Sequence, residues 1–254
     1  MNRLGFPQKQ GVNVYGNSER SSWWVPVTHR TDSWELEPSY TWQVRRSDFD
    51  KMLLDEAVKR GATLVKGKAL KPINDNGTVR GVEVKMADGG IQKFASEMLL
   101  DCSGQATWLA NTRSVTGPKY LGAYDKQIAI FSQVKGAIRE HDGTREKHKD
   151  NTIIFYKKKY HWAWFIPLDA ETVSVGIVIP SQYFLDQKES KKDFYMRELR
   201  ELHPGLAARM PGDIELAEDV HVIPNYSYQV KDFTGKGCAS ATRTASSIRS
   251  SRSA

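Results

Sequence analysis

Two tryptophans two positions apart are the residues of this 254-residue sequence whose types and spacing point most directly to chemistry. Trp162 and Trp164 stand in the segment W-A-W-F-I-P, which ends in Ile166 and Pro167. Alternate residues of a strand point to one face of its sheet, so we expect both indoles on the same face. Such a pair can line a binding site for a flat ring, or it can fill a core. The spacing alone leaves both interpretations open.

A second group of residues is of a kind that binds nucleotides. Arg46, at the start of an expected helix, is a permanent cation with several N–H donors, suited to phosphate or ribose oxygens. Asp101, Ser103 and Gly104 follow the short buried strand 98–100, where a glycine lets the backbone approach a ligand closely. The alternatives are a solvated arginine at a helix start and an ordinary turn after a strand.

The remaining residue types indicate no metal site and no catalytic pair. The six histidines and two cysteines show no metal-ligand spacing, and Asp101 beside Cys102 does not make a nucleophile and its base. The net charge is +7, and three of these charges come from arginines in residues 238–254, so the charge predicts no nucleic-acid partner. The sequence has no signal-peptide pattern and no apolar run of ~20 residues, which predicts a cytoplasmic protein without a membrane span.

Regular elements that could position these residues follow from the hydrophobic pattern. Residues 47–60 predict a helix with one apolar face, capped by Ser47 and ended by Gly61. Asn76-Gly77 predicts a hairpin turn. Alternation over residues 127–179 predicts an antiparallel sheet, and residues 189–202 predict a second helix.

Four segments resemble, in the same order, those of the FAD-dependent halogenase and monooxygenase superfamily, and most of all its tryptophan-halogenase-like branch. They are V-x-R-x-x-F-D at Val44–Asp50, D-x-S-G at Asp101–Gly104, W-x-W-x-I-P at Trp162–Pro167, and residues 225–237. The resemblance covers nearly all of residues 1–237. It implies FAD as the cofactor of the intact protein, a small-molecule substrate, and a flavin reductase as electron donor if the protein is a halogenase.

The resemblance also implies an α/β fold of the p-hydroxybenzoate-hydroxylase type. In that fold a FAD/NAD(P)-binding Rossmann-like domain is interleaved with an antiparallel β-sheet substrate domain, and this sequence is expected to contain the FAD domain only in part. Arg46, Asp101, Ser103 and Gly104 would contact FAD, and Trp162, Trp164, Ile166 and Pro167 would line the region between flavin and substrate. The expected order is a substrate-domain β segment (1–42), the partial FAD domain (43–113), the substrate-domain sheet (114–225), a return to the FAD domain (226–237) and a tail (238–254).

Two parts of the family pattern are absent from this sequence. No G-x-G-x-x-G motif occurs, and the catalytic lysine of the halogenases is expected in the same preceding part, so no catalytic residue is assigned. Residues 238–254 read CASATRTASSIRSSRSA where the family continues with a buried strand and Gly-Asp. Reading these codons from their third base permits R-I-G-D-A-H-R-F-I-D-P, the family's segment. We therefore expect a reading-frame shift near Gly237–Cys238 and a disordered tail; the alternative is a genuine disordered Ser/Arg-rich tail.

The predicted function of the parent protein is that of a flavin-dependent oxidoreductase of the halogenase type. Reduced FAD, oxygen and halide would halogenate an electron-rich substrate. The alternatives are a FAD-dependent hydroxylase, a geranylgeranyl-reductase-like reductase, or a non-enzymatic remnant. With both ends of the FAD site missing from the pattern, the chain as written is expected to be an inactive fragment that binds FAD weakly or not at all.

Overall fold

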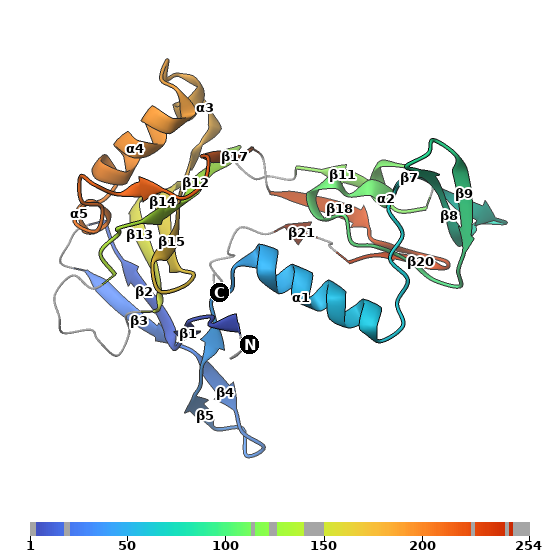
Figure 1. Ribbon diagram of the computed structural model, residues 1–254, viewed down its shortest axis with the longest axis horizontal. Helices are drawn as coiled ribbons and strands as arrows, with labels where there is room; N and C mark the ends of the chain where they lie inside the picture. Colours follow the sequence, from blue (N-terminus) through green and yellow to red (C-terminus); the bar gives the residue numbers. More distant parts are fainter. Residues whose placement is uncertain are drawn as a thin grey trace. The chain divides into compact units, whose positions relative to one another are not determined.

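Two compact units alternate along the chain in this computed structural model (Figure 1). Unit 1 comprises residues 1–56 and 126–224, and unit 2 comprises residues 57–125 and 225–254. The chain crosses between the units after residues 56, 125 and 224, whereas the predicted crossings fall after residues 42, 113 and 225. The structure describes residues 4–17, 21–112, 115–121, 126–139, 150–224, 227–241 and 244–245.

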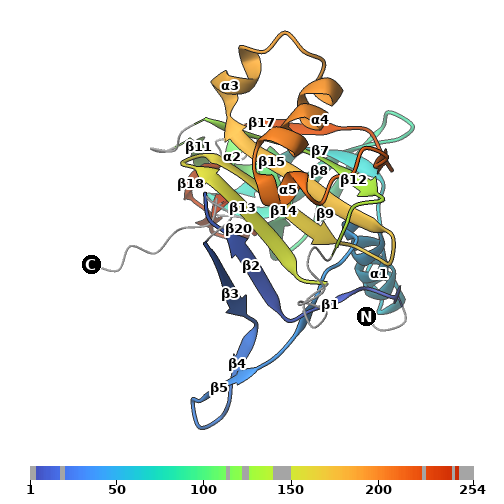
Figure 2. The same ribbon diagram turned by 90° about the vertical axis from the view of Figure 1, so that its left-hand side faces the viewer.

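Unit 1 is built on an eight-stranded mixed sheet, seen in Figure 2. The predicted antiparallel sheet is confirmed in the four strands from β12 to β15. Strand β12 pairs with β15, β15 pairs with β14, and β14 pairs with β13, all antiparallel. One pair, β13 with β2, is parallel, a pairing between distant segments that strand patterns do not reveal. The strands are β2 (Gly11–Tyr15), β3 (Ser22–Pro26), β12 (Gln127–Lys135), β13 (Thr152–Lys158), β14 (His161–Pro167), β15 (Thr172–Pro180), β16 (Glu215–Leu216) and β17 (His221–Pro224).

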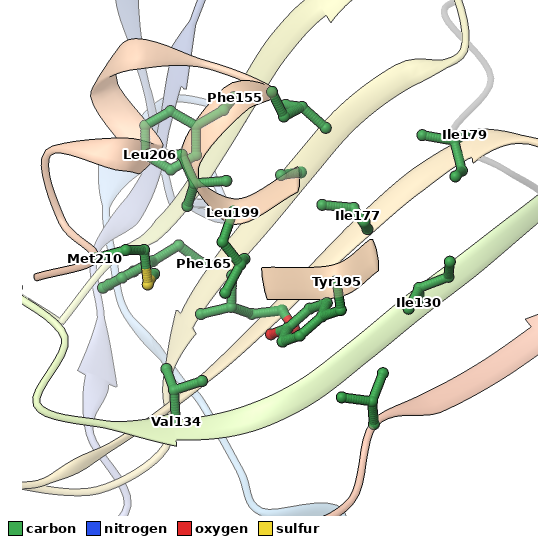
Figure 3. Close-up of a cluster of buried hydrophobic side chains, with 14 of the residues drawn as sticks. Ile130, Val134, Phe155, Phe165, Ile177, Ile179, Tyr195, Leu199, Leu206 and Met210 are labelled. Carbon is green, nitrogen blue, oxygen red and sulfur yellow. The ribbon is translucent and has the colours of Figure 1, made fainter. Parts of the chain in front are cut away.

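One face of this sheet packs against helices α4 (Lys191–Glu201) and α5 (Pro204–Ala207), and the core of unit 1 lies between them (Figure 3). α4 matches the predicted helix and begins where the Ser190 hydroxyl accepts the Asp193 N–H at 3.1 Å. Tyr195 is buried on its inner side and donates its hydroxyl to the carbonyl oxygen of Val175 at 2.8 Å. This bond ties the helix to the middle of β15.

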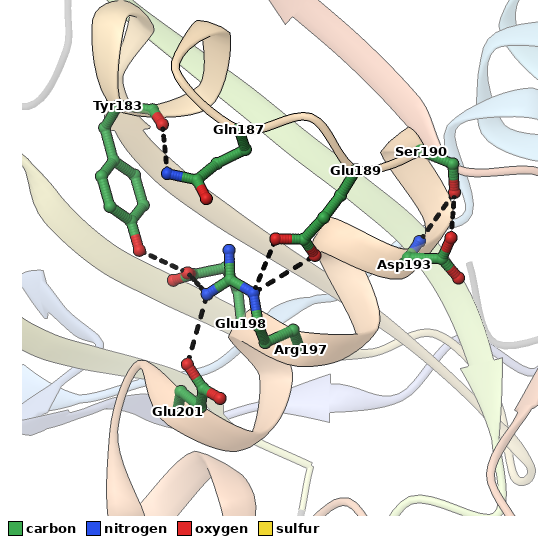
Figure 4. Close-up of polar contacts among 8 residues, drawn as sticks. All are labelled: Tyr183, Gln187, Glu189, Ser190, Asp193, Arg197, Glu198 and Glu201. Atoms are coloured by element: carbon green, nitrogen blue, oxygen red, sulfur yellow. Dashed lines mark hydrogen bonds and ion pairs between the residues drawn. The ribbon is translucent and has the colours of Figure 1, made fainter.

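A buried carboxylate joins α4 to the short helix α3 (Ser181–Leu185), as Figure 4 shows. Glu198 is buried and accepts the Tyr183 hydroxyl at 2.7 Å and the Arg197 guanidinium at 2.8 Å. Arg197 also pairs with Glu189 at 3.1 Å and with Glu201 at 3.2 Å. The network compensates the buried charge from two sides, which is what a carboxylate in this position requires.

Short ladders complete unit 1. β1 (Gln8–Lys9) pairs with β6 (Thr41–Trp42), and β4 (Thr28–Arg30) pairs with β5 (Leu36–Pro38). Gln43 follows β6 and accepts the Thr152 hydroxyl at 2.7 Å, which fastens the β1–β6 ladder to the first residue of β13.

Unit 2 contains three small sheets. The predicted hairpin joins β7 to β8, with Asn76 at φ +47° and Gly77 at φ +80°. In the second sheet β10 and β20 are parallel, an arrangement typical of an α/β layer. The elements are β7 (Gly67–Asp75), β8 (Thr78–Met86), β9 (Ile91–Ala95), β10 (Leu99–Asp101), the 3-10 helix η2 (Gly104–Ala106), α2 (Trp108–Asn111), β11 (Gly117–Tyr120), β18 (Tyr228–Asp232), β19 (Thr234–Gly235), β20 (Cys238–Ser240) and β21 (Thr244–Ala245).

Two predictions differ from the structure in detail. Helix α1 (Arg46–Lys59) begins one residue earlier than predicted, so Ser47 lies inside its first turn, and none of its residues is buried. The segment predicted to be disordered begins with an ordered strand, because Cys238 packs its small apolar side chain against Val79 and Leu109. Residues 225–226 of the fourth family segment, and residues 242–243 and 246–254 of the tail, lie outside the described residues. None of the described helices combines the length and apolar character that crossing a membrane requires.

Candidate functional site

Four aromatic side chains form a row on the sheet of unit 1, on the face opposite to α4. Trp162 and Trp164 lie on β14 with ring centroids 6.1 Å apart. Trp164 is 5.8 Å from Phe131 on β12, and Phe131 is 5.4 Å from His221 on β17. We call these four residues the aromatic row. A row of tilted rings across three strands offers a broad apolar surface of the kind that binds a flat aromatic ligand.

The alternation of β14 explains which members of the W-x-W-x-I-P motif share this face. Residues 161, 163, 165 and 167 are buried toward α4, whereas Trp162, Trp164 and Ile166 are half-buried on the other face. Pro167 is therefore on the opposite side of the sheet from the two tryptophans, and it pairs with Val173 at the strand end. The structure brings three of the four predicted residues together and separates Pro167 from them.

Phe131 and His221 are members of the row that the sequence analysis did not identify. The core positions of β12 alternate as Ile128, Ile130 and Val134, so Phe131 falls on the other face by the same period. That signal was available in the sequence. His221 lies directly opposite Phe131 on β17, and this pairing depends on a return of the chain that no local pattern indicates.

A polar cavity of about 660 Å³ adjoins the aromatic row within unit 1. Gln133, two residues after Phe131 and on the same face of β12, lines it together with Arg45, Ser47 and Lys135. The Arg45 guanidinium donates to the side-chain oxygen of Gln133 and, at 2.5 Å, to Asp169. The site thus has an aromatic part and a polar part side by side, which suits a ring that carries a polar group.

Asp169 is held as a carboxylate by its neighbours. Burial alone would raise its pKa, but backbone N–H groups of Glu171 and Thr172 and the Arg45 guanidinium outweigh that effect and lower the pKa of Asp169 to about 2. The two N–H groups lie 2.9 and 2.7 Å from Oδ1, and Arg45 contacts Oδ2. Arg45 is therefore fixed in place by an anion at ordinary pH.

In unit 2, Asp101 and Ser103 shape the turn after β10. Asp101 is buried, and its two carboxylate oxygens accept the backbone N–H groups of Ser103 at 3.0 Å and Leu109 at 2.9 Å. The Ser103 hydroxyl accepts the N–H of Trp108 at 2.9 Å. These side chains organise the backbone between β10 and α2, including the turn that contains Gly104.

Gly104 has the properties required for close approach of a ligand to the backbone. Its φ is +61°, and a Cβ placed on it would meet no atom within 4 Å. The Tyr228 hydroxyl donates to the Gly104 carbonyl oxygen at 2.9 Å, and burial followed by the charge of Asp101 raises the pKa of Tyr228. Tyr228 therefore remains a donor that fixes this open turn.

Arg46 lies in unit 1, at the start of α1, with 77% of its side chain exposed. Its guanidinium donates to Asp50 one turn later, at 3.0 Å. An i,i+4 ion pair this exposed adds little to stability and leaves further N–H donors open to solvent. The structure thus presents Arg46 of unit 1 as an accessible cation and Gly104 of unit 2 as an accessible backbone turn.

One lysine in unit 1 has an unusual environment. Lys9 lies on β1 opposite Thr41, two residues before β2, and burial lowers the pKa of its amine. A desolvated lysine is a recurrent form of catalytic amine. Lys9 could not be predicted from the sequence, because a single lysine in a short segment carries no pattern.

Comparison with known proteins places these features in a family. The family model for tryptophan halogenases matches residues 14–203, which include the aromatic residues of β12 and β14. Among curated proteins, a 1H-pyrrole-2-carbonyl-[peptidyl-carrier protein] brominase of Pseudoalteromonas luteoviolacea is 33% identical over 237 residues, 93% of this chain and 54% of the relative. A tryptophan 2-halogenase of Chondromyces crocatus is 28% identical, over 92% of this chain and 42% of the relative.

A solved structure agrees with these relatives. That of the flavin-dependent brominase Bmp2 superposes with a TM-score of 0.82 at 32% identity, over 94% of this chain and 56% of Bmp2. The chain spans about half the length of the curated relatives it matches. The family model covers well over half of the sequence, and a relative 33% identical covers 93% of this chain, so the chain belongs to the tryptophan halogenase family.

Proposed function

We propose that the protein containing this chain is a FAD-dependent halogenase that acts on an electron-rich aromatic small molecule. The observation that carries the proposal is the aromatic row beside a polar cavity, within the segment that the tryptophan halogenase model matches. The two curated relatives act, by their names, on a pyrrole and on tryptophan. Both compounds contain an electron-rich nitrogen heterocycle, and we infer a substrate of the same class.

The residues of this chain are compatible with FAD binding, because Arg46 has N–H donors exposed to solvent and Gly104 has open space beside its backbone. Arg46 is an exposed cation suited to the phosphate or ribose oxygens, and Gly104 lets the backbone approach the nucleotide. Asp101 and Ser103 hold the Gly104 turn through their backbone bonds. When bound, FAD in its reduced form would give two electrons to oxygen, and the partly reduced oxygen would in turn take two electrons from the halide. A flavin reductase is the electron donor that we infer for this step.

The roles of the remaining residues follow from their surroundings. Trp162, Trp164 and Ile166 line the apolar face, orient the substrate ring and exclude water from it. Arg45, fixed by Asp169, can hold a polar group of the substrate. We propose Lys9 as the amine of the halogenation step, because burial lowers its pKa and a desolvated lysine is a recurrent form of catalytic amine.

The FAD part of the proposal is tested by titration of flavin fluorescence with wild-type protein and two variants. Arg46→Gln removes one charge-assisted contact, which is worth about 1.5–3 kcal/mol and so weakens FAD binding roughly tenfold to a hundredfold. Lys51→Gln is the matched control, because Lys51 pairs with Asp55 at 2.7 Å in the same i,i+4 manner on the same helix. Equal FAD affinity of Arg46→Gln and Lys51→Gln would contradict the assignment.

A further inference from the structure

The indole of Trp164, a residue of β14, lies over the neighbouring strand β15. Trp164 on β14 is directly opposite Gly176 on β15, and Gly176 is directly opposite Phe131 on β12. Adjacent strands are about 4.8 Å apart, so β14 and β12 are separated by about 9.6 Å. The ring centroids of Trp164 and Phe131 are nevertheless only 5.8 Å apart. The indole must therefore extend over Gly176 to reach Phe131.

Gly176 is the residue that makes room for this arrangement. A Cβ at this position would overlap Cζ2, Cη2 and Cε2 of Trp164, all of them atoms of the rigid indole. The backbone of Gly176 is not in the left-handed region, so its conformation does not itself require glycine. The absence of a side chain is explained here by the ring that lies on it.

Ser174 holds the same ring from its polar edge. Its hydroxyl oxygen accepts the Nε1–H of Trp164 at 3.2 Å. Ser174 and Gly176 are two residues apart on β15 and therefore face the same side of the sheet. One strand thus supplies both the space for the indole and the acceptor that fixes its rotation.

We propose that Ser174 and Gly176 are positioning residues of the aromatic row, which hold Trp164 flat so that its ring face is presented to a planar substrate. A ring held flat can stack on a planar ligand, whereas an indole standing upright would occupy the space above the sheet. The geometric part of this proposal stands on the contacts of β14 and β15 alone. Its consequence for substrate binding rests on the proposed function.

The orientation of the two indoles can be measured without any enzymatic assay. Trp162 and Trp164 are 6.1 Å apart with a 51° angle between their planes, a geometry that produces an exciton couplet in the circular dichroism spectrum. Trp162→Phe removes one partner and identifies the couplet. We expect Gly176→Ala to abolish or invert it, whereas Gly212→Ala leaves it unchanged, because a Cβ at Gly212 meets nothing within 4 Å. An unchanged couplet in Gly176→Ala would overturn the proposal.

A second pair of variants covers the case in which Gly176→Ala does not fold. Ser174→Ala adds no volume and removes only the acceptor of the Trp164 Nε1–H, so we expect faster hydrogen exchange of that indole proton and a weaker couplet. Ser174→Thr keeps the hydroxyl and restores the slower exchange. Wild-type exchange and a wild-type couplet in Ser174→Ala would overturn the proposal.

The link to the substrate is tested separately, with tryptophan as the probe. The loss of one aromatic contact, worth about 0.5–1.5 kcal/mol, raises KM roughly two- to tenfold in Gly176→Ala while kcat changes less. If the couplet changes and KM does not, the positioning of Trp164 holds and its role toward the substrate fails. If no substrate is turned over by wild-type protein, the proposed function fails and the spectroscopic result is unaffected.

Discussion

Replacing Asp169 by asparagine tests the electrostatic design of the polar cavity. The variant keeps one oxygen for the N–H groups of Glu171 and Thr172 but turns an amide toward the Arg45 guanidinium, so the ion pair is lost. The pKa of Asp169 is lowered from 3.8 to about 2. This shift corresponds to a contribution of at most about 2.4 kcal/mol to the free energy of unfolding. The Asp169 side chain is 41% exposed, so solvent screens its ion pair. We therefore expect Asp169→Asn to lower the free energy of unfolding by about 1 kcal/mol.

The sign of the pH dependence follows from the direction of this shift. A carboxyl group with a lowered pKa in the folded state stabilises the fold above its unfolded pKa, and that contribution disappears as pH falls from 3.8 toward 2. Urea unfolding followed by tryptophan fluorescence measures it, because six of the seven tryptophans lie in unit 1. Wild-type protein should exceed Asp169→Asn in stability at neutral pH, and the difference should vanish near pH 2.

The matched control is Glu171→Gln, in the same loop. Glu171 is largely exposed and pairs with Lys135 at 3.6 Å, so its substitution should change stability by less than about 0.5 kcal/mol. A stability difference between wild type and Asp169→Asn that stays constant from neutral pH to pH 2 would refute the reasoning. Equal stability at neutral pH would refute it as well.

Three further substitutions test the core, the buried charge and the proposed amine. Arg197→Met leaves the buried Glu198 carboxylate with less compensation and should cost about 2 kcal/mol in chemical unfolding; an effect no larger than that of an exposed ion pair would contradict this account. Tyr195→Phe removes the hydrogen bond to the Val175 carbonyl oxygen and should lower the free energy of unfolding by about 1 kcal/mol. An unchanged free energy of unfolding would show that this bond does not stabilise the fold. Lys9→Met should abolish halogenation at unchanged FAD affinity, and a variant as active as wild type would remove Lys9 from the mechanism.

The hydrophobic pattern was sufficient for elements whose packing is local. The alternation of β12, β14 and β15 predicted the antiparallel sheet, and the Asn76-Gly77 turn predicted the β7–β8 hairpin. It failed where a distant segment decides the outcome. Cys238 is ordered because it completes a small cluster with Val79 and Leu109, and no feature of residues 238–240 by themselves indicates that partner.

The candidate site shows the same division. Trp162 and Trp164 were found from their spacing, and the same period could have found Phe131 but excludes Pro167 from their face. The polar cavity could not be predicted, because Arg45 reaches a partner more than a hundred positions away in the sequence, Asp169. Contact of Asp101 with FAD stays a prediction; the sequence did not reveal that both of its carboxylate oxygens accept backbone N–H groups.

The central claim is that the aromatic row belongs to a site that puts halogen on an electron-rich ring. Mass spectrometry tests it directly on the protein supplied with FAD, NADH, a flavin reductase and bromide, with tryptophan and pyrrole-2-carboxylate thioester as probes. We expect a product with the isotope doublet of bromine that disappears when bromide or flavin is omitted. A product that gains oxygen whether or not bromide is present, or the absence of any bromide-dependent product from either probe, would contradict it.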